Sequence, residues 1–483
     1  MSARGFAAVA VATALAACSV GPEYVRPPVE IGIDSFKEAG GWRPAFPRDE
    51  VDRGPWWSIY RDRELERLLV QVDVSNQNLK AAEAAYRQSQ ALARQSRGAL
   101  FPTVGVVGGV QQSQVAGGAL GAGAQRTQIS LSGAVDWEID LWGRLRRSLE
   151  TDVALAQASA ADVAAARLSA QADLAASYFA LRIADEQRRL FEGTVAAFTR
   201  SLAIVRNQYE SGTASRTELL QAQTQLESAR AQLIDVGLRR AQQEHAIAVL
   251  VGKAPSDFAL PPGYLIDTIP SVEAGIPSAL LERRPDIASA ERQMAAANAR
   301  VGAAVASYFP DLTLGGSLGL VSTALNTLFN AGSLIWAVGP QLALTLFDGG
   351  QRQAQADAAR AAHERSVAIY RQTVLTAFQQ VEDQIAALRI LEAEARVQAG
   401  AVAAAQEAER LALNQYQAGT IPFTQVVLTQ TAALTARQTA LSIRLARLQA
   451  SVSLVRYLGG GWRATDLPKR ADAMRPAAPP AKP

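Results

Sequence analysis

Cysteine, histidine and lysine are scarce in this chain of 483 residues. Its single cysteine, Cys18, excludes an internal disulfide. Its two histidines, His245 and His363, stand far apart, so the sequence offers no cluster with the spacing of metal ligands. Lysine occurs at only five positions and the net charge is +3, so we expect no basic patch dense enough for nucleic acid. A GxxxxGK(S/T) phosphate loop is also missing, so we expect the chain to supply no energy of its own.

The amino terminus has the pattern of an export signal. Arg4 precedes an apolar run, Gly5–Ala14, and small residues then end in LAAC, whose cysteine is Cys18. The apolar run is too short to span a membrane. LAAC resembles the lipobox of bacterial lipoproteins, which implies that the cysteine becomes the acylated first residue of the mature protein. We therefore predict a signal peptide at 1–17 and a lipid-anchored segment at 18–62, against the alternative of a stray thiol.

Sequence landmarks recur along the chain at a nearly constant offset. The offset is 208 for the first pair and 207 for the other three, and chance is a poor explanation for such a register. The pairs are Phe101-Pro102 with Phe309-Pro310, Gly143 with Gly350, YESGT at 209–213 with YQAGT at 416–420, and Gly252 with Gly459. We infer an internal duplication. The predicted parts are a first structural repeat at 63–252, an equatorial connector at 253–277, a second repeat at 278–459, and an equatorial segment with a disordered Pro- and Ala-rich tail at 460–483.

Each repeat predicts the same order of helices. The first helix is stopped by the Phe-Pro pair, because proline lacks an N–H group and disfavours helix in the residue before it. After the strands comes a proline-free helix, which at 1.5 Å per residue would be roughly 100 Å long. A glycine turn then reverses the chain into another helix. The expected long elements are 63–98 and 286–308 before the Phe-Pro pairs, and 144–211 and 351–417 after the strands.

Apolar spacing indicates that each glycine turn closes a coiled-coil hairpin. Steps of 4 and 3 residues alternate along the first long helix, and apolar residues repeat every seven positions in the last helix, both typical of coiled-coil seams. The first seam is Phe191, Val195, Phe198, Leu202, Val205 and Tyr209, and the second is Val427, Leu434, Leu441, Leu448 and Val455. Helices joined by a short turn with such seams pack antiparallel, so Gly212 and Gly419 mark the two hairpin tips.

Between the helices, residues alternate between apolar and polar, which is the period of a strand with one dry and one wet face. In QISLSGAVDWEIDLWG, at 128–143, every odd position from Ile129 to Leu141 is apolar or glycine, while the even positions are small or acidic. Stretches at 104–110, 312–320 and 334–346 alternate in the same way. We therefore predict four strands.

Two structures are compatible with these strands. A soluble β-sandwich is one, but four strands in two pairs far apart in the sequence would make a thin core. A transmembrane barrel fits better, because its strands of about 9 to 11 tilted residues alternate apolar-out and polar-in. Four strands cannot close a barrel, since an open edge is not tolerated in hydrocarbon and the smallest barrels need about eight strands. The chain must then share a barrel with copies of itself, and closure alone does not choose between two, three or four.

Several stretches together resemble the TolC-type outer membrane factors, especially their lipoprotein branch with multidrug efflux members. The stretches are CSVGPEYVRP at 18–27, WWSIYRDRELERLL at 56–69, RRPDIASAERQMAAANARVGAAVASYFPDLTLGGSLG at 283–319, LFDGGQRQAQ at 346–355 and the paired YxxGT turns. The resemblance implies a membrane α+β fold. Three subunits with four strands each would form a twelve-stranded outer membrane β-barrel, continuous with a coiled-coil periplasmic tunnel that is closed at the hairpin tips.

The same resemblance implies a function and partners. The homotrimer would be the passive exit duct of a tripartite exporter in the outer membrane, reaching into the periplasm. An inner-membrane RND-type pump would supply the energy, and a periplasmic adaptor would dock at the hairpin tips. The implied docking residues are Tyr209, Gly212, Thr213, Tyr416, Gly419 and Thr420. Apart from membrane lipid and the covalent lipid on Cys18, no cofactor, metal or nucleic acid is implied.

The gate is expected at the same tips, where the chain departs from the family. Efflux members often carry an acid shortly after the second tip glycine, whereas Thr420, Ile421 and Pro422 stand there in this chain. The gate candidates that remain are Glu210, Glu218, Gln417 and Ile421. For the two glutamates, a solvated carboxylate at a helix end is the alternative. The acids expected in the barrel lumen are Asp136, Glu138, Asp140 and Asp311, which would favour cations or simply keep the inner wall wet.

Two other functions compete with the duct. GGSLG at 315–319 matches the GxSxG nucleophile elbow, with Asp348 and His363 in the order of an α/β-hydrolase. That elbow needs a strained strand-to-helix turn, whereas Ser317 lies within an alternating strand, so we expect no enzyme. A non-conducting trimeric coiled-coil lipoprotein, acting as a spacer or adhesin, shares the helices and the anchor, but only a duct needs a closed barrel. The cargo stays open, because a duct takes its specificity from its pump.

Overall fold

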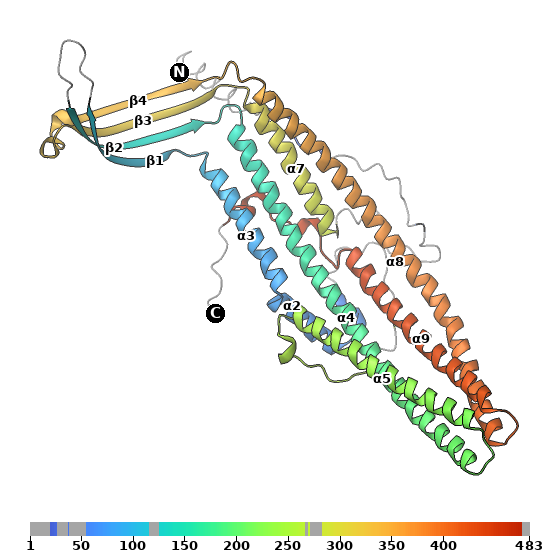
Figure 1. Cartoon of the computed structure of the whole chain (residues 1–483). Coiled ribbons are helices and arrows are strands. Elements are labelled where there is room, and N and C mark those ends of the chain that lie inside the picture. The colour runs from blue at the N-terminus through green and yellow to red at the C-terminus, as the bar shows by residue number, and fades with distance from the viewer. Residues whose placement is uncertain are drawn as a thin grey trace.

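The computed structural model describes residues 20–26, 37, 55–114, 125–265, 269–270 and 283–475. They form an elongated molecule with a β-sheet at one end and two helical hairpins at the other (Figure 1). None of the helices in these ranges combines the length and the apolar character needed to cross a membrane. Cys18, the signal peptide and the end of the predicted tail lie outside the described residues.

Four strands form one antiparallel sheet in the order β1-β2-β3-β4. Their bounds are Thr103–Gln114 for β1, Gln125–Ile139 for β2, Asp311–Ser322 for β3 and Leu334–Ala343 for β4. The two repeats meet in the middle, where β2 pairs with β3 from Ile129 opposite Ser322 to Ile139 opposite Leu312. The four predicted strands are confirmed, although the last ends at Ala343 and does not reach 346.

The register places the apolar positions of all four strands on one face of the sheet. Val104 lies opposite Val135, and Leu318 lies opposite Trp336. This face is bare in the single chain, since Val104 is 75% exposed, Trp336 71% and Val338 70%. The outer edges of β1 and β4 have no neighbouring strand among the described residues. A large apolar face with two open edges marks a surface that needs an apolar solvent and further strands.

The first repeat contains α2 (Arg63–Ser75), α3 (Gln77–Gly98), α4 (Arg144–Glu210) and α5 (Arg216–Leu250). The sequence predicts one helix over 63–98, and this is wrong, because Asn76 breaks it. The Asn76 side chain caps α3 by accepting a hydrogen bond from the backbone N–H of Leu79 at 3.0 Å. Its amide also donates to the carbonyl oxygen of Leu250 at 2.8 Å, so the break holds the end of α5.

The second repeat contains α7 (Pro285–Ala306), α8 (Gln351–Gln417) and α9 (Phe423–Tyr457). This repeat contains an equivalent of the contact between Asn76 and Leu250. Arg284 donates from Nη1 to the carbonyl oxygen of Tyr457, the last residue of α9, at 3.1 Å. The two donors are 208 residues apart and the two acceptors 207. The duplication read from the sequence landmarks thus extends to individual tertiary contacts.

The main core lies between the sheet and the hairpin tips, where both repeats meet. A short 3₁₀ helix, η2 (Trp56–Tyr60), inserts its aromatic side chains there. The ring of Tyr60 lies 5.1 Å from that of Phe179 in α4, and its hydroxyl lies 2.9 Å from the hydroxyl of Ser451 in α9. The indole N–H of Trp56 donates to Gln171 at 3.1 Å. This segment therefore joins α4 of the first repeat to α9 of the second.

α4 packs against α5, and α8 against α9, as two antiparallel hairpins (Figure 1). Phe191, Phe198 and Val205 of the predicted first seam are buried, in agreement with the prediction. Tyr209 is 40% exposed, so its predicted place in that seam is wrong. The apolar cluster at this level contains Tyr416 from the second hairpin, whereas Tyr209 is not part of it.

Candidate functional site

The two hairpin tips have the same turn. Gly212 and Gly419 adopt φ angles of 79° and 76°, in the left-handed region that glycine enters at little cost. The backbone N–H and the hydroxyl of Thr213 both donate to the carbonyl oxygen five residues earlier, at 2.8 and 3.0 Å. Thr420 makes the same two bonds at 3.0 and 2.9 Å. The YxxGT motif therefore specifies the backbone of the turn.

Next to the turns, the two hairpins share one apolar cluster. Its buried members are Val205 from α4, Ala222 from α5, Tyr416 from α8, and Phe423 and Val426 from α9. The rings of Tyr416 and Phe423 are 5.2 Å apart and tilted by 60°. The hydroxyl of Tyr416 donates to the side-chain oxygen of Gln208 in the first hairpin. Ile421, a predicted gate residue, packs against this cluster and is only partly exposed.

Glu218 connects the first hairpin to the second. It forms a capping box with Ser215 at the start of α5, with backbone N–H bonds of 2.8 and 3.2 Å. Its other oxygen lies 3.5 Å from the backbone N–H of Phe423, at the start of α9, which has no side-chain cap of its own. One carboxylate thus faces the positive ends of two helix dipoles. Burial, and then the charge of Glu218, raises the pKa of Tyr416.

The other gate candidates lie outside this contact. Glu210 and Gln417 occupy equivalent positions at the ends of α4 and α8, and both are exposed. The structure therefore brings Glu218, Tyr416 and Ile421 together. Phe423 is a site residue that the sequence did not predict, although the difference between the two repeats at this position signals it. It stands directly after the second turn, where the first repeat has an exposed arginine.

At the opposite end of the molecule, two arginines lie close to three of the four predicted lumen acids. Nη2 of Arg144 lies 2.6 Å from Glu138, and its Nε lies 3.8 Å from Asp311. Nε of Arg146 lies 3.2 Å from Asp140, which also accepts backbone N–H bonds at the start of α4. Basic residues of the first turn of α4 therefore offset part of the negative charge of these three acids, and their preference for cations stays a prediction.

The fourth acid and the candidate nucleophile lie on the same face of the sheet. Asp136 of β2 lies opposite Thr103 of β1. Ser317 lies in the middle of β3, between Ala134 and Ala337 of its neighbours, and not at a strand-to-helix turn. Among the residues that the structure describes, no group of three or more His, Cys, Asp or Glu side chains could hold a metal ion.

The described amino-terminal residues begin where the sheet meets the helices. The backbone N–H of Val20 donates to the carbonyl oxygen of Trp142 at 3.1 Å. The chain then runs along α7, where Asn298 donates to the carbonyl oxygen of Pro22 at 3.1 Å. The Trp142 ring stacks on Phe309 at 4.8 Å, and its indole N–H donates to a backbone oxygen at 2.9 Å. Aromatic rings of this kind are typical of a membrane interface, with one side apolar and the other wet.

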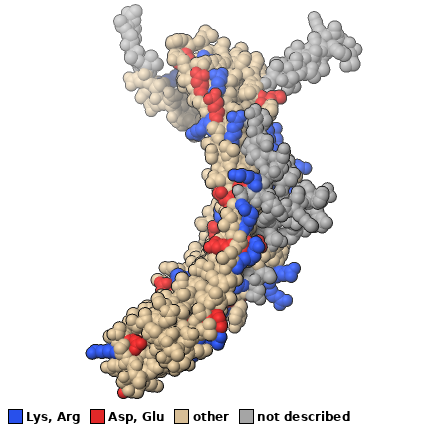
Figure 2. Space-filling view, turned by 90° about the vertical axis from the view of Figure 1, so that its right-hand side faces the viewer, with Lys and Arg blue, Asp and Glu red and all other residues tan. Residues whose placement is uncertain are grey.

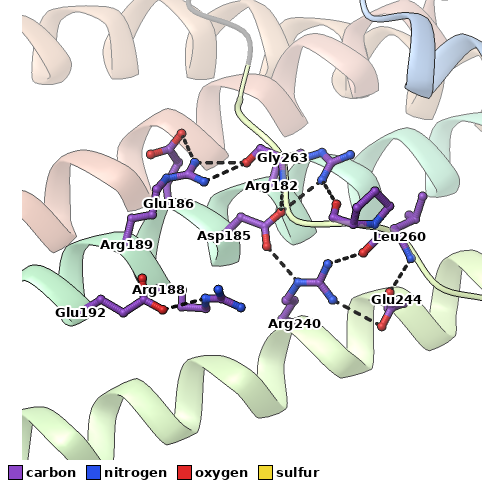
Figure 3. A network of polar contacts seen from close by, with 11 residues as sticks. Arg182, Asp185, Glu186, Arg188, Arg189, Glu192, Arg240, Glu244, Leu260 and Gly263 are labelled. Atoms are coloured by element: carbon purple, nitrogen blue, oxygen red, sulfur yellow. Dashed lines mark hydrogen bonds and ion pairs between the residues drawn. The ribbon is translucent and has the colours of Figure 1, made fainter.

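A network of arginines holds the chain after α5 against the first hairpin (Figure 3). The carboxylate of Asp185, which is 2% exposed, accepts hydrogen bonds from Arg182 at 3.1 Å, Arg240 at 2.8 Å and the backbone N–H of Gly263 at 3.0 Å. Arg240 also donates to the carbonyl oxygen of Leu260 at 2.5 Å. A buried charge that is paired on both oxygens resists displacement, because removing one partner leaves the other unpaired. The part of the predicted connector before residue 266 is thus fixed to α4 and α5.

Between this network and the tip cluster lies a cavity of about 260 Å³. It separates α4, with Gly193 and Phe198, from α8 and α9, with Glu409, Gln430 and Arg437. Nη2 of Arg437 lies 3.1 Å from Glu409. Burial raises the pKa of Glu409 and outweighs the lowering effect of that arginine. The two hairpins are therefore packed less tightly here than in the cluster at the tips.

The face of the molecule in Figure 2 carries charged side chains mainly along its upper and middle parts, and few on the hairpins. On this face, the few charges near the tips would cause a neighbouring protein little electrostatic repulsion. The functional candidates of this chain therefore form two regions: a membrane end, built around the sheet, and a tip end, built around two glycine turns.

A protein family described as outer membrane efflux protein matches residues 68–253 and 276–460 of this chain. The toluene efflux pump outer membrane protein TtgF of Pseudomonas putida is 32% identical over 470 residues, which cover 95% of this chain and 97% of that protein. The cation efflux system protein CusC of Escherichia coli is 29% identical over 457 residues, or 94% and 98% of the two chains. The solved structure of the outer-membrane channel OprN covers 92% of this chain and 100% of its own, with a TM-score of 0.85 and 26% identity.

Proposed function

The chain belongs to the outer membrane efflux protein family, and from that premise we propose that three copies of it form the passive exit duct of a tripartite efflux system. The family that the sequence resemblance predicted is confirmed, and the chain is an outer membrane efflux channel. In the proposed assembly, an RND-type pump in the inner membrane supplies the energy, and a periplasmic adaptor joins the pump to the duct.

The observation that carries the proposal is the sheet with its bare apolar face and two unpaired edges. In hydrocarbon, each unpaired backbone group costs several kcal/mol, roughly 2 to 7 by transfer experiments. Pairing β4 of one copy with β1 of the next removes both edges. Three copies then give twelve strands, above the minimum of about eight for a closed barrel. The apolar face meets lipid, and the face with Asp136 and Ser317 lines the lumen.

A lipid on Cys18 is the proposed second attachment to the membrane. Val20 is bound at the carbonyl of Trp142, beside the stacked ring of Phe309 and the end of the sheet. An acylated residue two positions earlier in the sequence would therefore have its anchor near the membrane. A single acyl chain binds only marginally, so several chains would be needed. The mass of the amino-terminal peptide of the mature protein tests this, since an unmodified cysteine there would contradict it.

The hairpin tips are the proposed place of both gating and adaptor docking. Exposed Tyr209, Thr213 and Thr420 are accessible to an adaptor. Gly212 and Gly419 hold the turns, and Tyr416 supports them from within the cluster. Glu218 holds the first hairpin to the start of α9, and so keeps the second hairpin in place. Loosening this contact should open the tunnel, because no other side chain in the described part of the chain caps α9.

Conductance in planar bilayers tests the function. We expect the purified trimer to insert with a small, mostly closed conductance, and Glu218→Gln to raise the open probability. Glu210→Gln is the matched control, because Glu210 is an exposed acid of the same tip that lies outside the contact between the hairpins. Permanent electrical silence in well-inserted protein, with and without Glu218→Gln, would support a non-conducting spacer or adhesin and contradict the duct.

The proposal names no cargo. The relatives TtgF and CusC carry toluene and cations in their names, although both align with nearly the whole of this chain. Proteins of similar sequence are therefore named for an apolar cargo in one case and for a charged cargo in the other. In the proposed lumen, Arg144 and Arg146 offset part of the negative charge of Glu138, Asp140 and Asp311. Selectivity in the proposed system belongs to the pump.

A further inference from the structure

Each of the two longest helices has a glycine in its interior, at equivalent positions of the two repeats. Gly193 in α4 and Gly400 in α8 are 207 residues apart, the same offset as the tip glycines, and each precedes its tip glycine by 19 residues. Glycine inside a helix is less favourable than alanine by about a factor of five in the helical population of the residue. The presence of this disadvantage in both repeats calls for a physical reason.

Packing within the chain does not supply that reason. A Cβ atom built on Gly193 or on Gly400 would meet no heavy atom within 4 Å. Both positions are exposed, and neither has the positive φ that would require glycine. Two reasons remain. Either a neighbouring copy of the chain approaches these positions closely, or the helices must be able to bend there.

The surroundings of Gly193 favour bending. Towards the sheet, α4 is fixed by the buried carboxylate of Asp185 and its arginine partners. Towards the tip, Phe198 and Val205 are locked into apolar clusters. Gly193 lies between these two fixed segments and lines the cavity of about 260 Å³ that separates α4 from the second hairpin. A flexible residue beside empty space, between two rigid segments, has the arrangement of a hinge.

The partner helix of the first hairpin has the same feature at a nearby level. Arg240 of α5 binds Asp185, and Gly237 lies one turn closer to the tip. A Cβ on Gly237 would also meet no heavy atom within 4 Å. Both helices of the first hairpin are therefore weakened just beyond the arginine network. Bending there would move the end of the first hairpin relative to the part of α4 that the arginines fix.

We propose that Gly193 and Gly400 are matched hinges at which the hairpin ends bend when the tunnel opens. The hinge rests on the duct function proposed above. In this structure α4 and α8 are continuous helices, and we take that form as the closed state. Opening takes the backbone at the two glycines out of regular helix, a change that disfavours alanine more than glycine. The segment towards the sheet stays in place, and the tips with Glu218 and Phe423 swing away from the tunnel axis.

The test uses the full-length trimer with both glycines replaced, Gly193→Ala with Gly400→Ala. We expect its open probability in planar bilayers to fall at least about fivefold, because alanine favours the continuous helix. The thermal stability of the trimer should rise for the same reason. If close approach by a neighbouring copy explains the glycines, the added methyl groups lower the thermal stability instead. Either that loss or an unchanged open probability overturns the hinge.

A shifted hinge provides the matched control. Ala196 and Ala403 are exposed, lie three residues nearer the tips and are themselves equivalent positions. Adding Ala196→Gly and Ala403→Gly to the alanine double variant moves the flexible point by about one helical turn. Opening should recover, and failure to recover contradicts the hinge. If the parent trimer never conducts, the proposed duct function is wrong. If the parent and the variants conduct equally, only the hinge proposal is wrong.

Discussion

The two hairpin tips have the same turn and opposite surroundings. Tyr209 and Tyr416 begin equivalent YxxGT motifs, but Tyr209 is 40% exposed and Tyr416 only 6%. One position after the capping residue, the first repeat has exposed Arg216 and the second has Phe423, which is 1% exposed. The motif therefore specifies how the chain reverses. The residues around it decide which hairpin fills the shared core.

The two helices that leave the turns also begin differently. α5 starts after Ser215 and is capped by its own Glu218, whereas α9 starts after Pro422 and has no side-chain cap. The only carboxylate near the start of α9 among the described contacts is Glu218, at 3.5 Å from the backbone N–H of Phe423. The first hairpin is thus complete in itself, while the second depends on the first. Asymmetry of this kind suits a gate in which one hairpin moves against the other.

Phe423→Ala should reveal the largest difference in stability between the two tips. Removing a buried phenylalanine from the tip cluster should cost about 3 to 5 kcal/mol of stability, through lost burial and the cavity left behind. Arg216→Ala, at the equivalent exposed position, should stay within about 0.5 kcal/mol. Thermal unfolding of the trimer in detergent measures both. Equal effects at the two positions would show that the tips do not differ in the way their burial indicates.

The turns and the strands could be read from the sequence because each depends on local chemistry. Gly212 and Gly419 report a backbone that only glycine adopts easily, and both have φ near 80°. Alternation from Ile129 to Ile139 reports one wet and one dry face, whatever covers the dry one. Such signals are complete within a few residues, so the fold of this chain was largely predictable.

The features that the sequence did not predict depend on residues far apart in the chain. Asn76 breaks a helix that looks continuous, because its partner is the carbonyl of Leu250. Arg144 lies 3.8 Å from Asp311, which no local pattern reveals. Glu218 could be named as a tip acid from the sequence, but its contact with Phe423 spans 205 residues. The members of the candidate site were therefore partly predictable, whereas their pairing was not.

Glu218→Ala, compared with Ser215→Ala, should show that α5 is capped by its own residues, whereas the start of α9 depends on Glu218. Ser215→Ala removes only the cap of α5 and should cost about 1 kcal/mol. Glu218→Ala removes the same capping box and also the contact with α9, so we expect about 1 to 2 kcal/mol. Hydrogen exchange should accelerate at the first turn of α5 in both variants, but at the first turn of α9 only in Glu218→Ala. Protection of α9 in both variants would mean that it does not depend on the first hairpin.

Tyr416→Phe should have the smallest effect, and one that changes with pH. It removes the bond to Gln208 and should cost about 0.5 to 1.5 kcal/mol near neutral pH, whereas Tyr209→Phe at the exposed equivalent position should cost almost nothing. Burial raises the pKa of Tyr416 above its usual value of 10.0, so the folded protein holds this proton more tightly than the unfolded chain. That contribution is complete below pH 10 and is lost as the pH rises through the raised pKa. The stability difference between the parent and Tyr416→Phe should therefore shrink in strong alkali. Parallel pH curves for the parent and Tyr416→Phe would place Tyr416 in water and remove the asymmetry between the tips.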